Sequence, residues 1–184
     1  MPAAPDDAGL IKHTQNWLRD IVIGHGLCPF AKAEHDAGTI RYAVIRDDDL
    51  QSQAEEILAA CAALDARKNI ETTLLIFPAG LSGFEDYLSL IDLAADALKA
   101  AGYEGVYQLA SFHPDYRFAG SESDDPANYT NRSPYPVIHI LREASVEKAI
   151  AGFPNPENIP ARNIRLTRGL GIEVMRDLLA GCLQ

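Results

Sequence analysis

The sequence contains few cysteines and no long apolar run. Its three cysteines (Cys28, Cys61 and Cys182) are an odd number and form no Cys-x-x-Cys pair, which argues against a disulfide framework and favours a reducing cytoplasm. No apolar run is long enough to span a membrane. The N-terminus lacks a basic region followed by an apolar one, so we expect no signal peptide and a cytoplasmic protein.

Positive charge is also scarce. With 16 Lys and Arg against 26 Asp and Glu, the formal net charge is -10. Because an acidic chain repels phosphate groups, we expect neither nucleic acid nor an anionic membrane as a partner, whereas a small-molecule ligand is compatible with this charge. The P-loop, GxGxxG, HExxH and GxSxG motifs are all missing from the sequence, so it indicates no particular cofactor.

The chain has the size and composition of one globular domain. Its 184 residues, 47% of them hydrophobic, are enough for a sizeable core, and no repeat or linker divides them. We expect a loose tail over residues 1–9, in which Asp6 or Asp7 caps the first helix, and a single α/β domain over residues 10–184. The sequence leaves the oligomeric state open.

The spacing of apolar residues predicts helices that alternate with strands. A first helix is expected from Leu10 to the Gly-His-Gly at 24–26, and Pro29 is suited to open a short second helix with Cys28 at its N-cap. Strands are expected over residues 39–45, 71–77, 105–112 and 136–141. The remaining helices are expected over residues 50–64, 82–102, about two turns after 145, and 159–183, the last broken near Gly169 and Gly171.

This order predicts an α/β fold with a mixed four-stranded sheet packed with helices. Three strands are expected to be parallel and joined by right-handed helical crossovers. The fourth is expected to turn back antiparallel beside the third. A ferredoxin-like α+β topology is the alternative.

The segment between the last two expected strands is unusually long and polar. Loops of this length tend to be either functional or disordered, and its prolines and aromatic residues predict an ordered one. It begins at His113, at the carboxyl edge of the expected sheet. Ligands gather at this edge in open parallel sheets, so we expect the site there.

The candidates for catalysis are Cys28, His113 and Asp115. Cys28, before Pro29 at a helix start, is placed to be a nucleophile, a redox thiol or a soft-metal ligand, with a buried, inert thiol as the alternative. His113 is a candidate general acid or base, oriented by Asp115. His139 is expected on the same sheet face as His113, as a substrate contact or as a buried histidine bonded to backbone.

Polar side chains of the same loop are candidates for holding a substrate. The guanidinium groups of Arg132 and Arg117 form forks that suit a carboxylate or phosphate, and Asn131 lies beside Arg132. Cys28, His113 and His139 lack a recognised metal-ligand spacing, so the sequence assigns no metal ligand, although the three residues can still converge in space.

Four segments resemble a known family: "GLCPFA", "SFHPDYRFAG", "NYTNRSPYPVIHILRE" and "IPARNI". They are similar to a family of bacterial proteins known as domain of unknown function 1415. The resemblance extends from about residue 10 to residue 182. It implies a bacterial, cytoplasmic, single-domain protein and supplies no catalytic residues.

Three functions therefore remain open. The first is an enzyme that acts on a small polar or anionic molecule through Cys28 and His113, which needs a pocket containing one of them. The second is a metal- or haem-binding protein, which needs Cys28 and the two histidines to converge. The third is a non-catalytic interaction module, whose rigid loop is packed structure.

Overall fold

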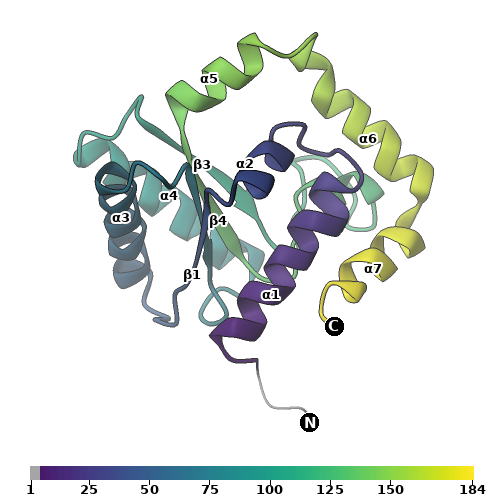
Figure 1. The fold of residues 1–184 in the computed structure, drawn as a ribbon. Helices are drawn as coiled ribbons and strands as arrows, with labels where there is room; N and C mark the ends of the chain where they lie inside the picture. The colour runs from purple at the N-terminus through teal and green to yellow at the C-terminus, as the bar shows by residue number, and fades with distance from the viewer. Residues whose placement is uncertain (1–4) are drawn as a thin grey trace.

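The structure, a computed structural model, describes residues 5–184 and shows a four-stranded sheet between layers of helices (Figure 1). The strands are β1 (Ile40–Val44), β2 (Thr72–Ile76), β3 (Tyr107–Phe112) and β4 (Val137–Arg142). The described residues form seven α-helices: α1 (Asp7–Trp17), α2 (Ala31–Ala37), α3 (Leu50–Ala66), α4 (Phe84–Ala100), α5 (Glu143–Ala151), α6 (Ile159–Leu170) and α7 (Ile172–Gly181). The α/β class is confirmed, and each strand lies where the sequence predicts it.

The strand order is β1-β2-β4-β3. β1 and β2 pair in parallel, whereas β4 pairs antiparallel with both β2 and β3. The prediction of three parallel strands is wrong in this detail, because β4 inserts between β2 and β3 and leaves only β1 and β2 as parallel neighbours. The chain order also differs from β-α-β-β-α-β, the order of the ferredoxin-like alternative.

The apolar content of β4 explains its central position. Val137, Ile138 and Ile140 are fully buried, on both faces of the strand, and an edge position would expose part of that surface. The residues of β1 and most of those of β3 are only half-buried, and these two strands form the edges.

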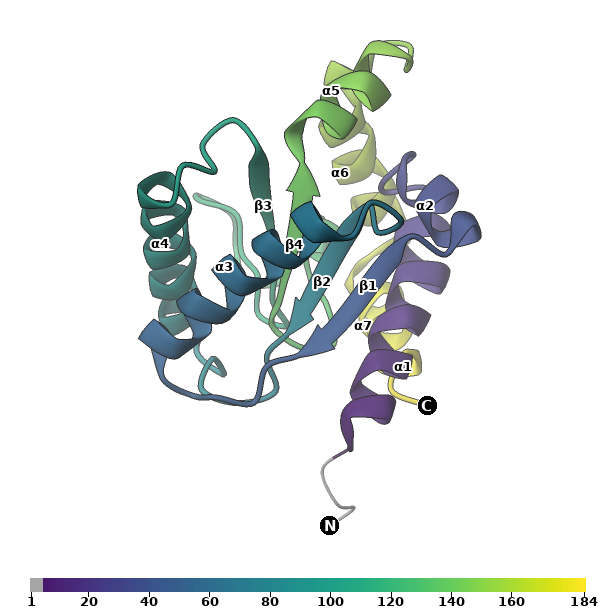
Figure 2. The same cartoon turned by 60° about the vertical axis from the view of Figure 1, so that its left-hand side comes forward.

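Each face of the sheet has its own core. On one face, α3 and α4 pack against Leu75 and Ile138. On the other, α1 and α7 pack against Leu74, Ile76 and Val137. Successive strand residues point to opposite faces, which is why β2 is apolar through its second half. Figure 2 shows α3 and α4 on one side of the sheet, with α1 and α7 on the other.

The first helix begins earlier and ends differently than expected. It begins at Asp7, and the carboxylate of Asp6 caps it by accepting a hydrogen bond from the Gly9 N–H at 2.9 Å. The expected tail over residues 1–9 is thus too long, and its residues 1–4 lie outside the described residues. After Trp17 the helix continues as a π-helix, η1 (Leu18–Ile23), which the sequence pattern does not predict.

The second helix begins later than expected. α2 starts at Ala31 with Phe30 in the N-cap position, so the prediction that Cys28 caps this helix is wrong. Cys28 precedes the helix in a turn, where its carbonyl accepts a hydrogen bond from the Ala31 N–H at 3.4 Å. Pro29 therefore forms part of a turn and does not open the helix. The macrodipole argument for a thiolate at Cys28 no longer applies.

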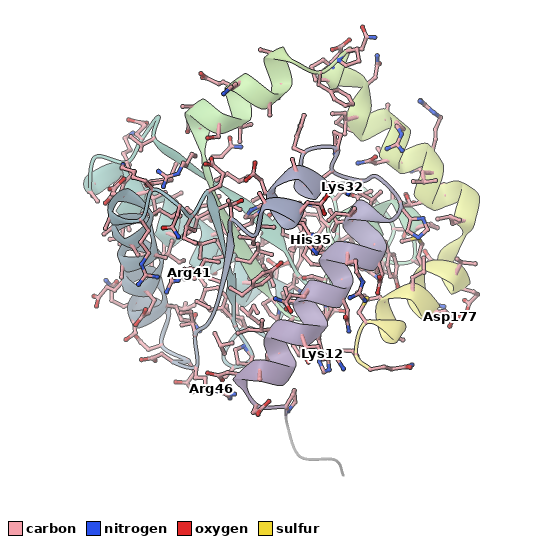
Figure 3. The ribbon with its side chains drawn as sticks, viewed as in Figure 1. Lys12, Lys32, His35, Arg41, Arg46 and Asp177 are labelled. Atoms are coloured by element: carbon pink, nitrogen blue, oxygen red, sulfur yellow. The ribbon has the colours of Figure 1, made fainter. Side chains whose placement is uncertain are left out.

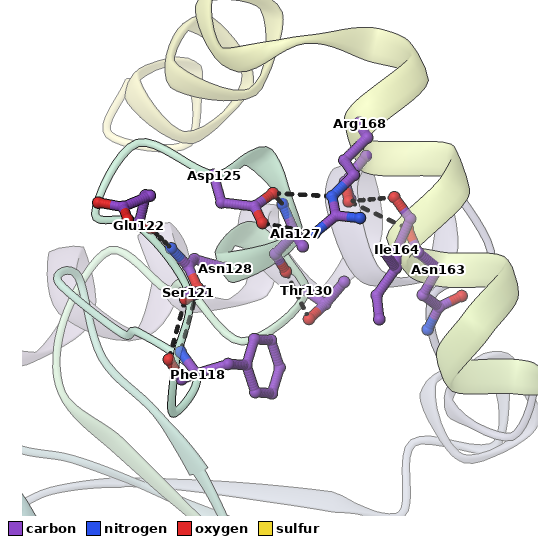
Figure 4. A network of polar contacts seen from close by, with 11 residues as sticks. Phe118, Ser121, Glu122, Asp125, Ala127, Asn128, Thr130, Asn163, Ile164 and Arg168 are labelled. Atoms are coloured by element: carbon purple, nitrogen blue, oxygen red, sulfur yellow. Dashed lines mark hydrogen bonds and ion pairs between the residues drawn. The ribbon is translucent and has the colours of Figure 1, made fainter.

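The long polar segment between β3 and β4 folds into a compact loop that contains a 3-10 helix, η2 (Pro126–Thr130). Asn128 is fully buried there, and its side chain binds three neighbours (Figure 4): it accepts from the Phe118 N–H and the Ser121 hydroxyl and donates to the Glu122 carbonyl. The loop is thus hydrogen-bonded internally.

Helix α6 holds this loop from outside. The Arg168 guanidinium donates to both carboxylate oxygens of Asp125, at 3.1 and 2.7 Å (Figure 4). This ion pair keeps the pKa of Asp125 low, at about 2. Arg168, one of the late basic residues of the sequence, is therefore used in ordinary ion pairing.

Charged side chains cover the outer surface of α1, α2, β1 and α7. Figure 3 labels six of them: Lys12, Lys32, His35, Arg41, Arg46 and Asp177. Arg46 pairs with Asp7 at 2.7 Å, an exposed contact that fixes the start of α1 to the end of β1. Across residues 5–184, no helix combines the length and the apolar character needed to cross a bilayer.

Candidate functional site

The carboxyl edge of the sheet, where the sequence places the site, is narrowed by contacts between its own loops. Gln53 of α3 donates from Nε2 to the Asp47 carbonyl at 2.8 Å. Gly80 lies so close to Asp48 that a Cβ on this glycine would be 2.9 Å from the Asp48 Cα. A cavity of about 260 Å³ remains beside Pro134 and Pro136, and His113 lines it.

His113 is buried in the wall of that cavity and is 1% exposed. Its Nε2–H donates to the Leu81 carbonyl at 2.9 Å, and its Nδ1 accepts from the Asp115 N–H at 3.0 Å. Burial lowers the pKa of His113, so the ring is neutral. Because both ring nitrogens are used, the geometry gives this histidine a structural role and does not support a general base. Asp115 contacts it through the backbone, while its carboxylate is exposed.

Arg132 braces the loop instead of facing an open site. Its Nε donates to the Tyr116 carbonyl at 3.1 Å and its Nη2 to the Ser123 carbonyl at 2.8 Å. The guanidinium carbon also lies 4.7 Å from the centroid of the Tyr129 ring. These contacts occupy the fork that the sequence suggests for an anionic substrate.

Asn131 and Arg117, two further expected substrate residues, do not line the cavity beside His113. Asn131 lines a different cavity, of about 380 Å³, together with Cys28. Asn131 donates from Nδ2 to the Ser111 carbonyl at 3.1 Å, which ties the loop to the end of β3. Arg117 is exposed and borders an open hollow beside Phe84.

A separate pocket of about 250 Å³ lies on the sheet face that α1 covers. Its floor includes Leu74, His139 and Ala110, which lie side by side across β2, β4 and β3. Its walls come from α1 and η1, the turn before α2, α2 itself and α5: Trp17, Leu18, Val22, Cys28, Phe30, Ala31, Glu34, Ser145, Val146 and Ala149. Cys28 and His139, which are far apart along the chain, thus line the same pocket.

The tautomer of His139 follows from its partner. The Thr72 hydroxyl donates to the Ile140 carbonyl at 2.6 Å, so it must accept from His139 Nε2–H, also at 2.6 Å. Nδ1 is then the unprotonated nitrogen, and it makes no hydrogen bond with any residue of the described range. Burial lowers the pKa of His139 to about 4, so the ring stays neutral at pH 7 and presents an acceptor.

Two charged side chains lie at the end of the pocket where β2 begins. The Glu71 Oε1 atom is buried and has no hydrogen-bond partner within residues 5–184. Arg142 also lines the pocket, but its Nη1 donates to the Tyr107 hydroxyl and its Nη2 to the carbonyls of Leu64 and Ile70. The carboxylate is therefore the more available of the two groups.

Cys28 lies between this pocket and a second one. The second cavity, of about 380 Å³, is lined by α6 and the loop after β3, and it shares Val22, Cys28 and Phe112 with the first. Helix α6 holds the turn before Cys28: Asn163 donates from Nδ2 to the Leu27 carbonyl at 2.7 Å, and Arg162 donates to the Gly26 carbonyl at 2.7 Å. The thiol is thus part of the wall between two cavities.

Sequence reasoning finds two members of the pocket and misses the rest. Cys28 and His139 are chosen for their residue type. Glu71, Thr72 and Ala110 have no such signal, because they meet only once β4 is placed between β2 and β3. In the part of the chain that the structure describes, no three His, Cys, Asp or Glu side chains are arranged to hold a metal ion.

Comparison with known families gives one match. The model of the family described as "Protein of unknown function (DUF1415)" matches residues 9–177, so the family resemblance seen in the sequence is confirmed. No curated protein and no solved structure matches the chain.

Proposed function

We propose that this chain, which belongs to the family of proteins of unknown function DUF1415, binds a small, largely apolar molecule in the pocket between α1, α5 and the sheet. One observation carries the proposal: a single cavity collects Cys28, His139 and Glu71 from distant parts of the chain, within walls that are mostly apolar. Small-molecule sites usually combine such walls with a few polar groups.

The volume of the pocket limits the size of the ligand. An engineered apolar cavity of about 150 Å³ holds a benzene molecule, so a cavity of about 250 Å³ suits a ligand somewhat larger than benzene. A haem macrocycle is several times larger than benzene, so the pocket does not favour haem.

The charge of the pocket does not favour the anionic substrate that the sequence suggests. Glu34 and Glu71 both line it, and the guanidinium of Arg142 is already bonded to a hydroxyl and two carbonyls. These carboxylates would repel an anionic ligand, whereas the apolar part of a ligand would contact Leu74 and Ala110 on the floor of the pocket.

Thiol chemistry is a second candidate function, favoured by the position of Cys28 in the wall of the pocket. The thiol can attack an electrophilic ligand held beside it. His139 is a poor partner for this reaction, because burial holds its pKa at about 4 and the ring takes up a proton weakly at pH 7. Its free Nδ1 suits ligand binding better.

Native mass spectrometry of protein purified from its own source tests the proposed function. We expect a bound small molecule on the natural chain and its loss in Ala110→Phe, which fills the floor of the pocket. Ala95→Phe, at an exposed position of α4, is the control and should keep the ligand. If Ala110→Phe remains folded by circular dichroism and retains the molecule, the pocket is not the binding site.

A further inference from the structure

The hydrogen-bond donors that border the pocket are already in use. Trp17 Nε1–H and the Thr72 hydroxyl donate to backbone carbonyls at 2.9 and 2.6 Å. The Arg142 guanidinium donates to a tyrosine hydroxyl and two carbonyls. Gln108 and Ser145, two further polar residues of the lining, are at least partly exposed to water.

Two acceptors of the pocket, in contrast, have no donor within the described residues. Glu71 Oε1 is buried without a partner in the described part of the chain. His139 Nδ1 is the unprotonated ring nitrogen, because Nε2–H is bound to Thr72 at 2.6 Å. Glu71 directly precedes Thr72, the hydrogen-bond partner of His139, and both Glu71 and His139 line the pocket. A buried acceptor without a donor is unfavourable, and a ligand N–H would satisfy it.

A second carboxylate favours a cation at the Glu71 end of the pocket. Glu34 adds a second carboxylate, which is held in position by a hydrogen bond from the Thr39 hydroxyl at 2.5 Å. The rings of Trp17 and Phe112 pack together at 5.0 Å toward the other end of the pocket, since Phe112 pairs with Val137 at the start of β4, and there they suit the apolar part of a ligand. The apolar surroundings strengthen the attraction between an ammonium and a carboxylate.

We infer that the ligand of this pocket is an organic amine, with a protonated amino group that binds Glu71 and His139 and an apolar body about the size of a benzyl group. The inference rests on the proposed function and adds the chemical class of the ligand. It also assigns a role to Glu71, a residue that no motif of the sequence indicates.

Intrinsic fluorescence provides the test, because Trp17 is the single tryptophan of the chain and lines the pocket. Three probes of similar size are titrated at pH 7 and constant ionic strength: benzylamine, ethylbenzene and benzoate. We expect benzylamine to bind at least about tenfold more tightly than ethylbenzene, and benzoate to bind most weakly. Glu71→Gln keeps the shape of the side chain, so it should weaken benzylamine binding about tenfold and leave ethylbenzene binding unchanged. Glu85→Gln, at an exposed position of α4, is the control and should change neither.

The outcomes separate the inference from the proposed function. If ethylbenzene binds and benzylamine binds no more tightly than ethylbenzene, the amine assignment is overturned and the pocket remains a binding site. The same holds if benzoate binds most tightly of the three. If benzylamine is preferred but Glu71→Gln has no effect, the role of Glu71 is overturned. If none of the probes binds, both proposals fail.

Discussion

At the scale of single residues, the three thiols differ in their access to water. Cys28 is half-buried, whereas Cys61 and Cys182 are buried, and burial raises their pKa to about 12 and about 11. Because the thiolate is the reactive form, iodoacetamide at pH 8 should modify Cys28 at least ~100-fold faster than the other two. Mass spectrometry of the labelled peptides measures the rates, and faster labelling of Cys61 or Cys182 in the folded protein would contradict the prediction.

His139 should make the stability of the protein depend on pH. Its folded-state pKa of about 4 lies below the unfolded value of about 6.5, so the unfolded state takes up the proton first as the pH falls. The stability contribution is complete above about pH 6.5 and is lost progressively toward pH 4. Between pH 7 and pH 5 we expect a loss of about 2 kcal/mol from this residue.

Urea unfolding of the natural chain and of His139→Gln at both pH values measures this loss. The glutamine does not titrate, so the variant should lose about 2 kcal/mol less on acidification, while the other ionisable groups contribute equally to both proteins. An identical pH dependence in the two proteins would show that the imidazole is not held neutral by burial.

Single residues also show why the candidate site is only half predictable. Cys28 and His139 can be chosen as candidates from the sequence because the side chains of cysteine and histidine are chemically reactive in any protein. The contacts of His113 could not be predicted, since its two partners, the Leu81 carbonyl and the Asp115 N–H, are backbone groups that no sequence pattern marks. The same holds for Arg132, whose fork binds backbone carbonyls.

At the scale of elements, the loop between β3 and β4 should depend on Arg132 for its stability. Arg132→Lys keeps the charge but cannot donate to the Tyr116 and Ser123 carbonyls in the same geometry, so we expect the free energy of unfolding to fall by about 1–2 kcal/mol. Chemical denaturation measures the change. Arg117→Lys, at an exposed position of the same loop, should stay within about 0.5 kcal/mol of the natural chain. Equal stability of Arg132→Lys would restore the idea of a free anion-binding group.

Helix α6 should control access to Cys28. Asn163 is 8% exposed and donates to the Leu27 carbonyl, directly before the thiol. Asn163→Ala removes this bond and frees the turn, so the labelling rate of Cys28 should rise by about tenfold, the effect of losing about 1.4 kcal/mol of local stability. Arg165→Ala, at an exposed position of the same helix, is the control. An unchanged rate would mean that the turn is held by other contacts.

The elements themselves follow from local patterns, but their arrangement does not. All four strands and the break between α6 and α7 at Gly171, which has φ 85°, come from apolar spacing and glycine. The insertion of β4 depends on which strand buries two apolar faces, a property of the complete sheet. The change from α1 to the π-helix η1 occurs at Trp17 and Leu18, two residues that line the pocket.

At the scale of the whole molecule, the binding pocket lies on a face of the sheet and not at its carboxyl edge. The insertion of β4 disrupts the parallel arrangement on which the edge rule depends. The edge loops are then free to close on one another through Gln53 and Gly80. The mostly apolar pocket lies instead above Ala110, where a small side chain on β3 leaves room beneath α5.

Helix α5 has no buried residue, and Figure 1 shows it standing away from α1 and α7. Its amides should therefore exchange rapidly with solvent in the free protein. A ligand in the pocket would contact Val146 and Ala149 and hold the helix against the sheet. Hydrogen exchange with and without saturating ethylbenzene should show slower exchange over residues 143–151 and 31–37, and no change over 78–83 and 113–116. Protection of the last two segments would place the ligand at the carboxyl edge, beside His113, and would overturn the assignment of the pocket.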